Sequence, residues 1–278
     1  MTTSSAAITQ AEKAKTFRAL HQRAGAFLIP NPWDAGSARL LEHLGFEALA
    51  TTSMGCAFSL GQRDNTLLRE QTLANAAAIA GATHLPVSAD LEKGFGDAPE
   101  AAAETIRLAA QAGVVGGSIE DATGREDDPI FELARAAERV RAAVDAARAL
   151  PFPFTLTARA ENYLHGRPDL KDTIRRLQAF QEAGADVLYA PCLPTREDIV
   201  EVVRSVDRPV NVVMGLRGAQ LSLAELAEIG VKRVSVGSAL YRTALGAFLR
   251  GAREMREHGT FDFAKDAANT REVSAVFS

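Results

Sequence analysis

The sequence is poor in cysteine and in aromatic residues. Aromatic residues make up 6% of the 278 positions, and the two cysteines, Cys56 and Cys192, are too few for a disulfide framework. No apolar run approaches the roughly 20 residues that cross a bilayer, and residues 1–10 lack the basic and apolar regions of a signal peptide. These absences exclude a disulfide-rich secreted domain and a membrane protein, and they predict a cytoplasmic location.

An excess of positive charge is also missing. The formal net charge is −4, and 24% of the residues are charged. This balance gives no basic footprint for nucleic acid or for an anionic membrane. The 47% of hydrophobic residues are ordinary for a globular chain with a sizeable core. We therefore expect the partner to be a small molecule.

Short apolar runs alternate with helical patterns along the whole chain. Strands are predicted at 26–29, 46–53, 86–92, 117–121, 154–160, 186–190, 209–214 and 232–237. Loops or amphipathic helices separate them, including helices at 38–44, 68–80, 98–112, 130–149 and 170–183, and a loop at 54–65. Eight such units in about 250 residues favour an α/β fold of the (β/α)8 TIM-barrel type. No stretch resembles a linker, so a single domain, 1–278, is expected.

The carboxyl-terminal part, 239–278, is longer than one closing helix requires. It contains an apolar-faced helical pattern at 239–257, a break at 258–260, and a second short helical region at 261–277. Additional helices with apolar faces often pack against another subunit. A homo-oligomer is therefore expected.

Acidic residues gather where the predicted strands end. Asp90 and Glu92 follow the third strand on alternate residues, so an extended backbone would present both to the same side. Glu120 ends the fourth strand, and Arg159 ends the fifth. One such pair of acids is more often a solvated edge or a helix cap, but its recurrence at one end of successive strands indicates a site. Oxygen ligands without nearby histidine or thiolate favour Mg²⁺ or Mn²⁺.

Several other residues fall at the same ends of the predicted strands. Arg159 could be an ion-pair partner of Glu120 or Glu161, or it could hold a substrate carboxylate or a developing oxyanion. The run 51–53, Thr-Thr-Ser, offers hydroxyl groups and amides, and Asn211 lies on the seventh strand. Gly94 belongs to a Gly-Phe-Gly turn that would allow close approach to a ligand.

Six stretches of this chain, in order, resemble the isocitrate lyase/phosphoenolpyruvate mutase family. They are Asn-Pro-Trp-Asp-Ala-Gly-Ser-Ala at 31–38, Thr-Thr-Ser at 51–53 followed by Gly61 and Asp64, Ser-Ala-Asp-Leu-Glu-Lys-Gly-Phe-Gly at 88–96, Ser-Ile-Glu-Asp at 118–121, Ala-Arg at 158–159, and Glu-Ala-Gly-Ala-Asp at 182–186. The resemblance extends from about residue 15 to residue 250.

The resemblance implies a Mg²⁺-dependent barrel that binds a 2-oxo or 2-hydroxy carboxylate and stabilises an enolate-like oxyanion. It implies that Asp90 is the direct metal ligand and that Arg159 holds the substrate. Further roles follow residue by residue: Asp64, Glu92 and Glu120 would reach the metal largely through water, and Thr52, Ser53 and Met54 would hold the substrate carboxylate. It also implies a dimer of dimers that exchanges a carboxyl-terminal helix between subunits.

The loop at 122–129 departs from the resemblance. The lyases of the family carry a Lys-Lys-Cys-Gly-His run there, whose cysteine is a general acid or base, whereas this chain reads Ala-Thr-Gly-Arg-Glu-Asp-Asp-Pro. The chain therefore looks like a mutase-like member without the catalytic cysteine. Glu126 or Asp128 could replace that group on a mobile loop, although a solvated acidic loop is the simpler interpretation.

Three functions remain open at this point. The acidic loop would repel a polyanion, which favours a lyase or hydrolase that cleaves a C–C bond of a small 2-oxo or 2-hydroxy carboxylate. The alternative is P–C bond chemistry of the phosphoenolpyruvate mutase or phosphonopyruvate hydrolase type. The third possibility is a barrel that binds a metabolite without catalysis.

Overall fold

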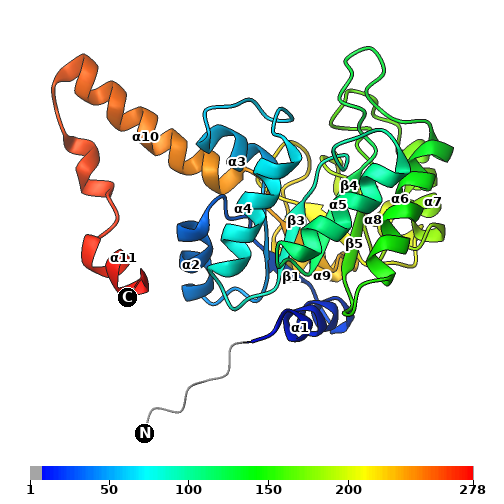
Figure 1. The fold of residues 1–278 in the computed structure, drawn as a ribbon. Coiled ribbons are helices and arrows are strands. Elements are labelled where there is room, and N and C mark those ends of the chain that lie inside the picture. The colour runs from blue at the N-terminus through cyan, green and yellow to red at the C-terminus, as the bar shows by residue number, and fades with distance from the viewer. Residues whose placement is uncertain (1–7, 278) are drawn as a thin grey trace, which may run out of the picture.

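A computed structural model describes residues 8–277, so residues 1–7 and 278 of the predicted domain lie outside the description. Its centre is one sheet of eight parallel strands in the order β1-β8-β7-β6-β5-β4-β3-β2 (Figure 1). The strands are β1 (Phe27–Ile29), β2 (Leu49–Ala50), β3 (Val87–Asp90), β4 (Gly116–Glu120), β5 (Thr155–Arg159), β6 (Val187–Tyr189), β7 (Val210–Val213) and β8 (Arg233–Ser235).

The two ends of this sheet meet and close it into a barrel. Phe27 of β1 is in register with Arg233 of β8. On the other side, the amide of Ala50 donates to the carbonyl of Pro30, immediately after β1, at 3.0 Å. The predicted (β/α)8 barrel is therefore confirmed.

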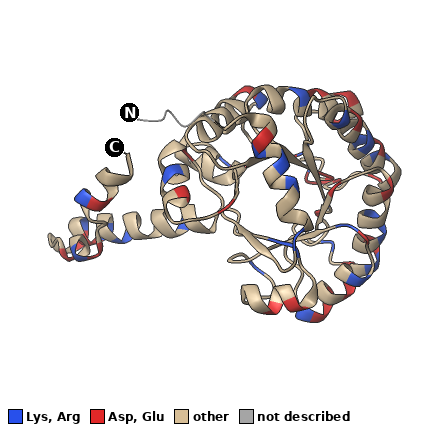
Figure 2. Ribbon diagram, turned by 90° about the horizontal axis from the view of Figure 1, so that it is seen from below, with Lys and Arg blue, Asp and Glu red and all other residues tan. Residues whose placement is uncertain are grey.

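Helices surround the barrel, as expected for parallel strands joined by crossovers (Figures 1 and 2). They are α1 (Gln10–Gln22), α2 (Ala35–His43), α3 (Ser53–Ser59), α4 (Arg69–Gly81), α5 (Pro99–Gln111), α6 (Leu133–Arg148), α7 (Leu170–Glu182), α8 (Arg196–Arg204), α9 (Leu223–Ile229), α10 (Ala239–His258), the 3-10 helix η1 (Asp262–Asp266) and α11 (Thr270–Phe277). Small apolar residues let α5 and α6 pack closely, with Ala102, Ala109, Ala136 and Ala143 all buried.

All eight strands form, but three predicted segments differ from the structure. The second strand, predicted at 46–53, is shortened to Leu49–Ala50, and Ser53 already begins α3. The third strand ends at Asp90 rather than continuing to Glu92, which has a left-handed backbone with φ of 48°. The predicted loop 54–65 contains most of α3, whose first turn is capped by Thr52 through a hydrogen bond from the Gly55 amide at 3.3 Å. Side-chain capping therefore starts a helix where apolar periodicity gave no signal.

Helix α1 closes the end of the barrel where the strands begin. Phe17 is fully buried, and its ring would touch a side chain placed at Gly116, the first residue of β4. His21, one turn later, packs edge-on against the rings of Phe17 and Phe27. The opposite end, where the strands finish, is thus left as the accessible one.

The two helical regions predicted after residue 239 are present and form an arm. Helix α10 projects away from the barrel, and the chain then returns through η1 to α11, which lies beside α2 (Figures 1 and 2). Arg39 of α2 donates to the carbonyl of Val276 at 3.0 Å. Only Gly251 is buried within α10, whereas Phe248 is 68% exposed. None of the described helices is long and apolar enough to cross a membrane.

An arginine on α6 holds the turn that follows β3. Arg139 is 1% exposed and donates to the carbonyls of Gly96, at 2.7 Å, and Lys93. Its guanidinium also lies 4.5 Å from the centre of the Phe131 ring. Burial lowers its pKa to about 10, which leaves it charged at neutral pH. The charge is thus used to fix the backbone next to Glu92.

Replacing this arginine should destabilise the barrel. Arg139→Met keeps most of the side-chain volume but leaves two half-buried carbonyls without charged donors, so we expect a loss of about 2–4 kcal/mol in the free energy of unfolding. Urea unfolding followed by circular dichroism measures it. Arg141→Met, an exposed site on the same helix, is the control. Equal stability of the two variants would contradict this role.

Candidate active site

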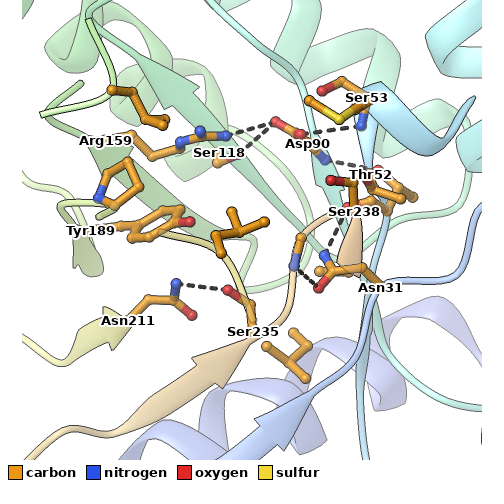
Figure 3. Close-up of a pocket in the computed structure, with 18 of the residues that line it drawn as sticks. Asn31, Thr52, Ser53, Asp90, Ser118, Arg159, Tyr189, Asn211, Ser235 and Ser238 are labelled. Carbon is orange, nitrogen blue, oxygen red and sulfur yellow. Dashed lines mark hydrogen bonds and ion pairs between the residues drawn. The ribbon is translucent and has the colours of Figure 1, made fainter. Parts of the chain in front are cut away.

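A cavity of about 520 Å³ opens at the carboxyl ends of the strands. Residues at or just after the ends of β2, β3 and β5, and Asn211 within β7, face it, among them Thr52, Asp90 and Arg159 (Figure 3). In barrels of this kind the active site lies at this end. The cavity is therefore the candidate active site.

Arg159, the last residue of β5, is surrounded by three carboxylates. Its NH1 atom lies 3.0 Å from Asp90 Oδ1 and 3.4 Å from Glu120 Oε2. Its Nε atom donates to Glu161 Oε1 at 2.9 Å. Burial lowers the pKa of Arg159, but the three carboxylates outweigh burial and raise it well above its usual value. Arg159 is thus a permanent cation, and its three ion pairs fix the orientation of its guanidinium.

Asp90 is the carboxylate that connects Arg159 to the rest of the cavity. Its Oδ2 atom accepts from the Ser53 amide at 3.2 Å, and its Oδ1 atom from the Ser118 hydroxyl at 3.5 Å (Figure 3). Its own amide donates to the Thr51 hydroxyl at 2.9 Å. Residues of β4, β5 and the start of α3 therefore meet at this carboxylate.

The other acids near Asp90 carry more negative charge than Arg159 neutralises. Burial raises the pKa of Glu92 to about 8, and the charges of Asp90 and Asp64 add to the effect. Burial and the Asp90 charge also raise the pKa of Asp64. Burial raises the pKa of Glu120 well above its usual value, and Arg159 offsets only part of this. An added cation would relieve this repulsion.

The chemistry of these groups suits a hard cation. Glu92 Oε1 is buried without a hydrogen-bond donor, an arrangement that is costly unless something else binds the oxygen. Asp64 and Asp90 line the cavity, whereas Glu92 and Glu120 lie behind its wall. Within residues 8–277, no three His, Cys, Asp or Glu side chains converge as a complete ligand group. A magnesium ion that keeps several waters needs only one or two carboxylates.

The structure brings most of the predicted substrate-binding residues together, but not Gly94. Thr52, Ser53, Met54 and Asn211 line the cavity. Gly94, with φ of 83°, instead packs against α5, where an added Cβ would lie 3.0 Å from the Ala102 Cα atom. The close approach that this glycine allows is therefore to a helix.

The two acids of the loop at 122–129 do not line the cavity. Glu126 and Asp128 are both exposed. Asp128 pairs with Arg125 at 3.1 Å, and Arg125 also pairs with Asp97 at 2.7 Å. A catalytic role for either acid would need the loop to move, and it stays a prediction.

Tyr189 and Ser118, which lie against Arg159 and Asp90, were not predicted as site residues. Tyr189 ends β6, and Arg159 lies 5.0 Å from the centre of its ring. Burial raises the pKa of the Tyr189 hydroxyl, so the group stays neutral. Ser118 ends no apolar run and reaches Asp90 from β4. Their common signal is position, because each lies near the carboxyl end of a strand.

The raised pKa of Glu92 predicts how stability depends on pH in metal-free buffer. The Glu92 carboxyl binds a proton more tightly in the folded protein than in the unfolded chain. Its contribution to stability is therefore complete below about pH 4.5 and is lost as pH rises through about 8. Glu92→Gln should remove this loss, giving at least about 1.4 kcal/mol more stability than the native protein at pH 9.

Urea unfolding between pH 5 and pH 9, with EDTA present, measures this difference. Glu100→Gln, at an exposed site on α5, controls for loss of a charge. If native protein and Glu92→Gln lose stability equally over this range, the proton is not held at Glu92.

Comparison with known proteins agrees with this geometry. A crystal structure from Burkholderia cenocepacia, whose name leaves open whether it is a lyase or a mutase, superposes with a TM-score of 0.95 at 65% identity, covering 97% of this chain and 96% of that chain. Oxaloacetate decarboxylase of Pseudomonas fluorescens is 28% identical over 91% of this chain and 88% of its own. Oxaloacetate acetylhydrolase in complex with oxalate matches at 26% identity and a TM-score of 0.86, covering 96% and 94% of the two chains.

The family model described as phosphoenolpyruvate phosphomutase matches residues 17–256, which is most of the chain. The match includes every strand of the barrel and each of the acids around Arg159. This protein therefore belongs to the phosphoenolpyruvate mutase family, within the phosphoenolpyruvate mutase/isocitrate lyase superfamily.

Proposed function

We propose that the protein is a Mg²⁺-dependent or Mn²⁺-dependent enzyme that cleaves a C–C bond of a small 2-oxo or 2-hydroxy carboxylate through an enolate-like intermediate. The observation that carries this proposal is the cluster of Asp90, Glu120 and Glu161 around Arg159 at the strand ends. Two of the relatives support it by their names, oxaloacetate decarboxylase and oxaloacetate acetylhydrolase.

Residues of this chain would divide the work as follows. Asp90 would bind the cation directly, with Asp64, Glu92 and Glu120 around it. The cation would supply a positive charge next to the oxygen that becomes negative in the reaction. Arg159, at the end of β5, would hold the substrate from the other side of that oxygen. Because three carboxylates already fix its guanidinium, little reorganisation is needed when the negative charge develops.

Ser53 and its neighbours would hold the substrate carboxylate. Ser53 lines the cavity, and its amide points at Asp90. Its hydroxyl donates to Asp64 Oδ1 at 3.4 Å. Thr52 and Met54 lie on either side of it in the wall of the cavity. This arrangement places donor groups on the same side of the cavity as the acids.

The first test is calorimetric titration with oxalate, a planar mimic of the pyruvate enolate. We expect binding that needs Mg²⁺ and is at least ~10²-fold weaker in Asp90→Ala, because one carboxylate supplies the direct bond to the cation. Asp90→Asn keeps the shape of the side chain and should behave alike. Asp145→Ala, exposed on α6, should bind as the native protein does.

The outcomes separate the candidate functions. Native protein that binds no oxalate with Mg²⁺ would favour a barrel without enolate chemistry. If oxalate binds, small 2-oxo and 2-hydroxy acids are screened for cleavage. Phosphorus-31 spectra of parallel mixtures with phosphonopyruvate test the P–C alternative, which the name of the matching family model favours.

We propose further that the protein is a homo-oligomer, as a dimer of dimers. The arm leaves Phe248 68% exposed and Phe261 67% exposed, and these apolar rings are on a segment that projects from the barrel (Figure 2). A second copy that covers the arm would remove this surface from water.

Light scattering tests the assembly. The native protein should have a mass of about four chains. Phe248→Glu should yield smaller species, because it places a charge in the covered surface. Arg250→Glu, at an exposed position on the same helix, controls for the added negative charge. A native monomer would contradict the assembly.

A further inference from the structure

A buried arginine without a carboxylate partner lies under the cavity. Arg233 begins β8, is 5% exposed and belongs to the residues that line the cavity. Among residues 8–277 no acid forms an ion pair with it, in contrast to Arg159. Burial lowers its pKa to about 10, so it is still charged at neutral pH. A buried charge is costly unless an anion compensates it.

The partners of Arg233 are all neutral and come from three sides of the barrel. Its Nε atom donates to Asn211 Oδ1 of β7 at 2.8 Å, and its NH2 atom donates to the Thr157 hydroxyl of β5 at 2.9 Å. Its NH1 atom lies 3.5 Å from Nε2 of His21, on α1. Arg233 thus crosses the barrel interior and forms the floor of the cavity.

This arginine sets the direction of the hydrogen bonds around it, because a guanidinium has donors and no acceptor. Asn211 must turn its amide oxygen toward Arg233, which leaves both amide hydrogens on the other side. One of them goes to the Ser235 hydroxyl oxygen at 3.1 Å (Figure 3). Ser235 therefore accepts from Asn211 and keeps its own hydrogen to donate.

His21 obeys the same rule on the opposite side of Arg233. Its Nδ1 atom donates to the Phe17 carbonyl at 2.8 Å, so Nε2 is free to accept from the guanidinium. Burial and the Arg233 charge lower the pKa of His21 to about 3, which keeps the ring neutral. The ring therefore supports Arg233 without competing with it for an anion.

We propose that Arg233, Asn211 and Ser235 form an anion-binding floor, and that Arg233 is the positioning residue that makes this floor a donor surface. The cavity residues Asn211 and Ser235 present hydrogens to the ligand, and the charge of Arg233 compensates a carboxylate of the substrate. The proposal deepens the proposed function, since it rests on the cavity being the substrate site. In this proposal an anionic group of the substrate binds at the floor, on the side of the cavity away from Asp90.

The polarity of the whole cavity supports this assignment. Around Asp90 the carboxylates outnumber Arg159, and a cation is needed. Around Arg233 a cation is present, and a negative group is needed. A carboxylate bound at the floor would compensate the charge of Arg233, with which no acid among the described residues forms an ion pair.

The test uses acetate in Mg²⁺-free buffer at constant ionic strength, so that it does not depend on the metal. In the native protein we expect acetate to raise Tm by at least ~2 °C, because it binds the folded state only. Acetamide, which has the same shape and no charge, should have no effect. The key variant is Asn211→Asp, which replaces the donor by an acceptor and gives Arg233 a carboxylate partner.

Asn211→Asp should fold with a Tm no lower than that of the native protein and should lose the effect of acetate. Asn269→Asp, the same change in the exposed arm, should keep it. In Arg233→Lys the compact ammonium cannot reach Asn211 and Thr157 together, so the acetate effect should be reduced if this variant folds. If it does not fold, Asn211→Asp decides.

Two results would overturn the proposal that the floor binds an anion. One is the absence of any acetate effect in the native protein, and the other is an equal effect in Asn211→Asp. Both are read without Mg²⁺, whereas the proposed function is tested by Mg²⁺-dependent oxalate binding to native protein and Asp90→Ala. The two proposals can therefore fail separately.

Discussion

The ion pair between Arg159 and Asp90 is the interaction on which the candidate site depends. It joins the ends of β5 and β3, and Asp90 in turn binds the Ser53 amide and the Ser118 hydroxyl. Its strength comes from burial, since a charged pair of this kind loses little to solvent screening. Glu120 and Glu161 restrict the guanidinium further. The barrel thus holds a cation in one orientation at the place where a reaction would develop negative charge.

The cavity has opposite electrostatic needs at its two sides. The side of Asp64, Asp90 and Glu92 is crowded with acids, and burial together with the charges of Asp90 and Asp64 raises the pKa of Glu92 to about 8. The floor at Arg233 carries uncompensated positive charge. A metal ion together with an anionic ligand would satisfy both sides at once, whereas either one alone would leave one side unsatisfied. This pairing gives a physical reason for the binding of the two to be coupled.

Much of the barrel outside the cavity positions this arrangement. Helix α1 closes the opposite end and supplies His21, which supports Arg233. Arg139 of α6 fixes the turn after β3, and with it the left-handed backbone of Glu92. The arm of α10 and α11 is different, because it leaves apolar rings exposed and packs against α2 through α11 at its end. Its first turn also reaches the site, since Arg242 of α10 lines the cavity.

The sequence by itself determined the eight alternating units, the barrel, and the acids at the strand ends, because apolar period and residue type are local properties of the chain. Motif order also identified the family before any geometry was known. Only the tertiary structure decided local backbone conformations and long-range contacts, which apolar periodicity does not encode. Glu92 leaves the strand alternation through a positive φ, and α3 starts from a side-chain cap. Gly94 turns to a helix, and Arg233 finds partners from β5, β7 and α1. Such contacts join residues up to 212 positions apart, and only closure of the barrel brings them together.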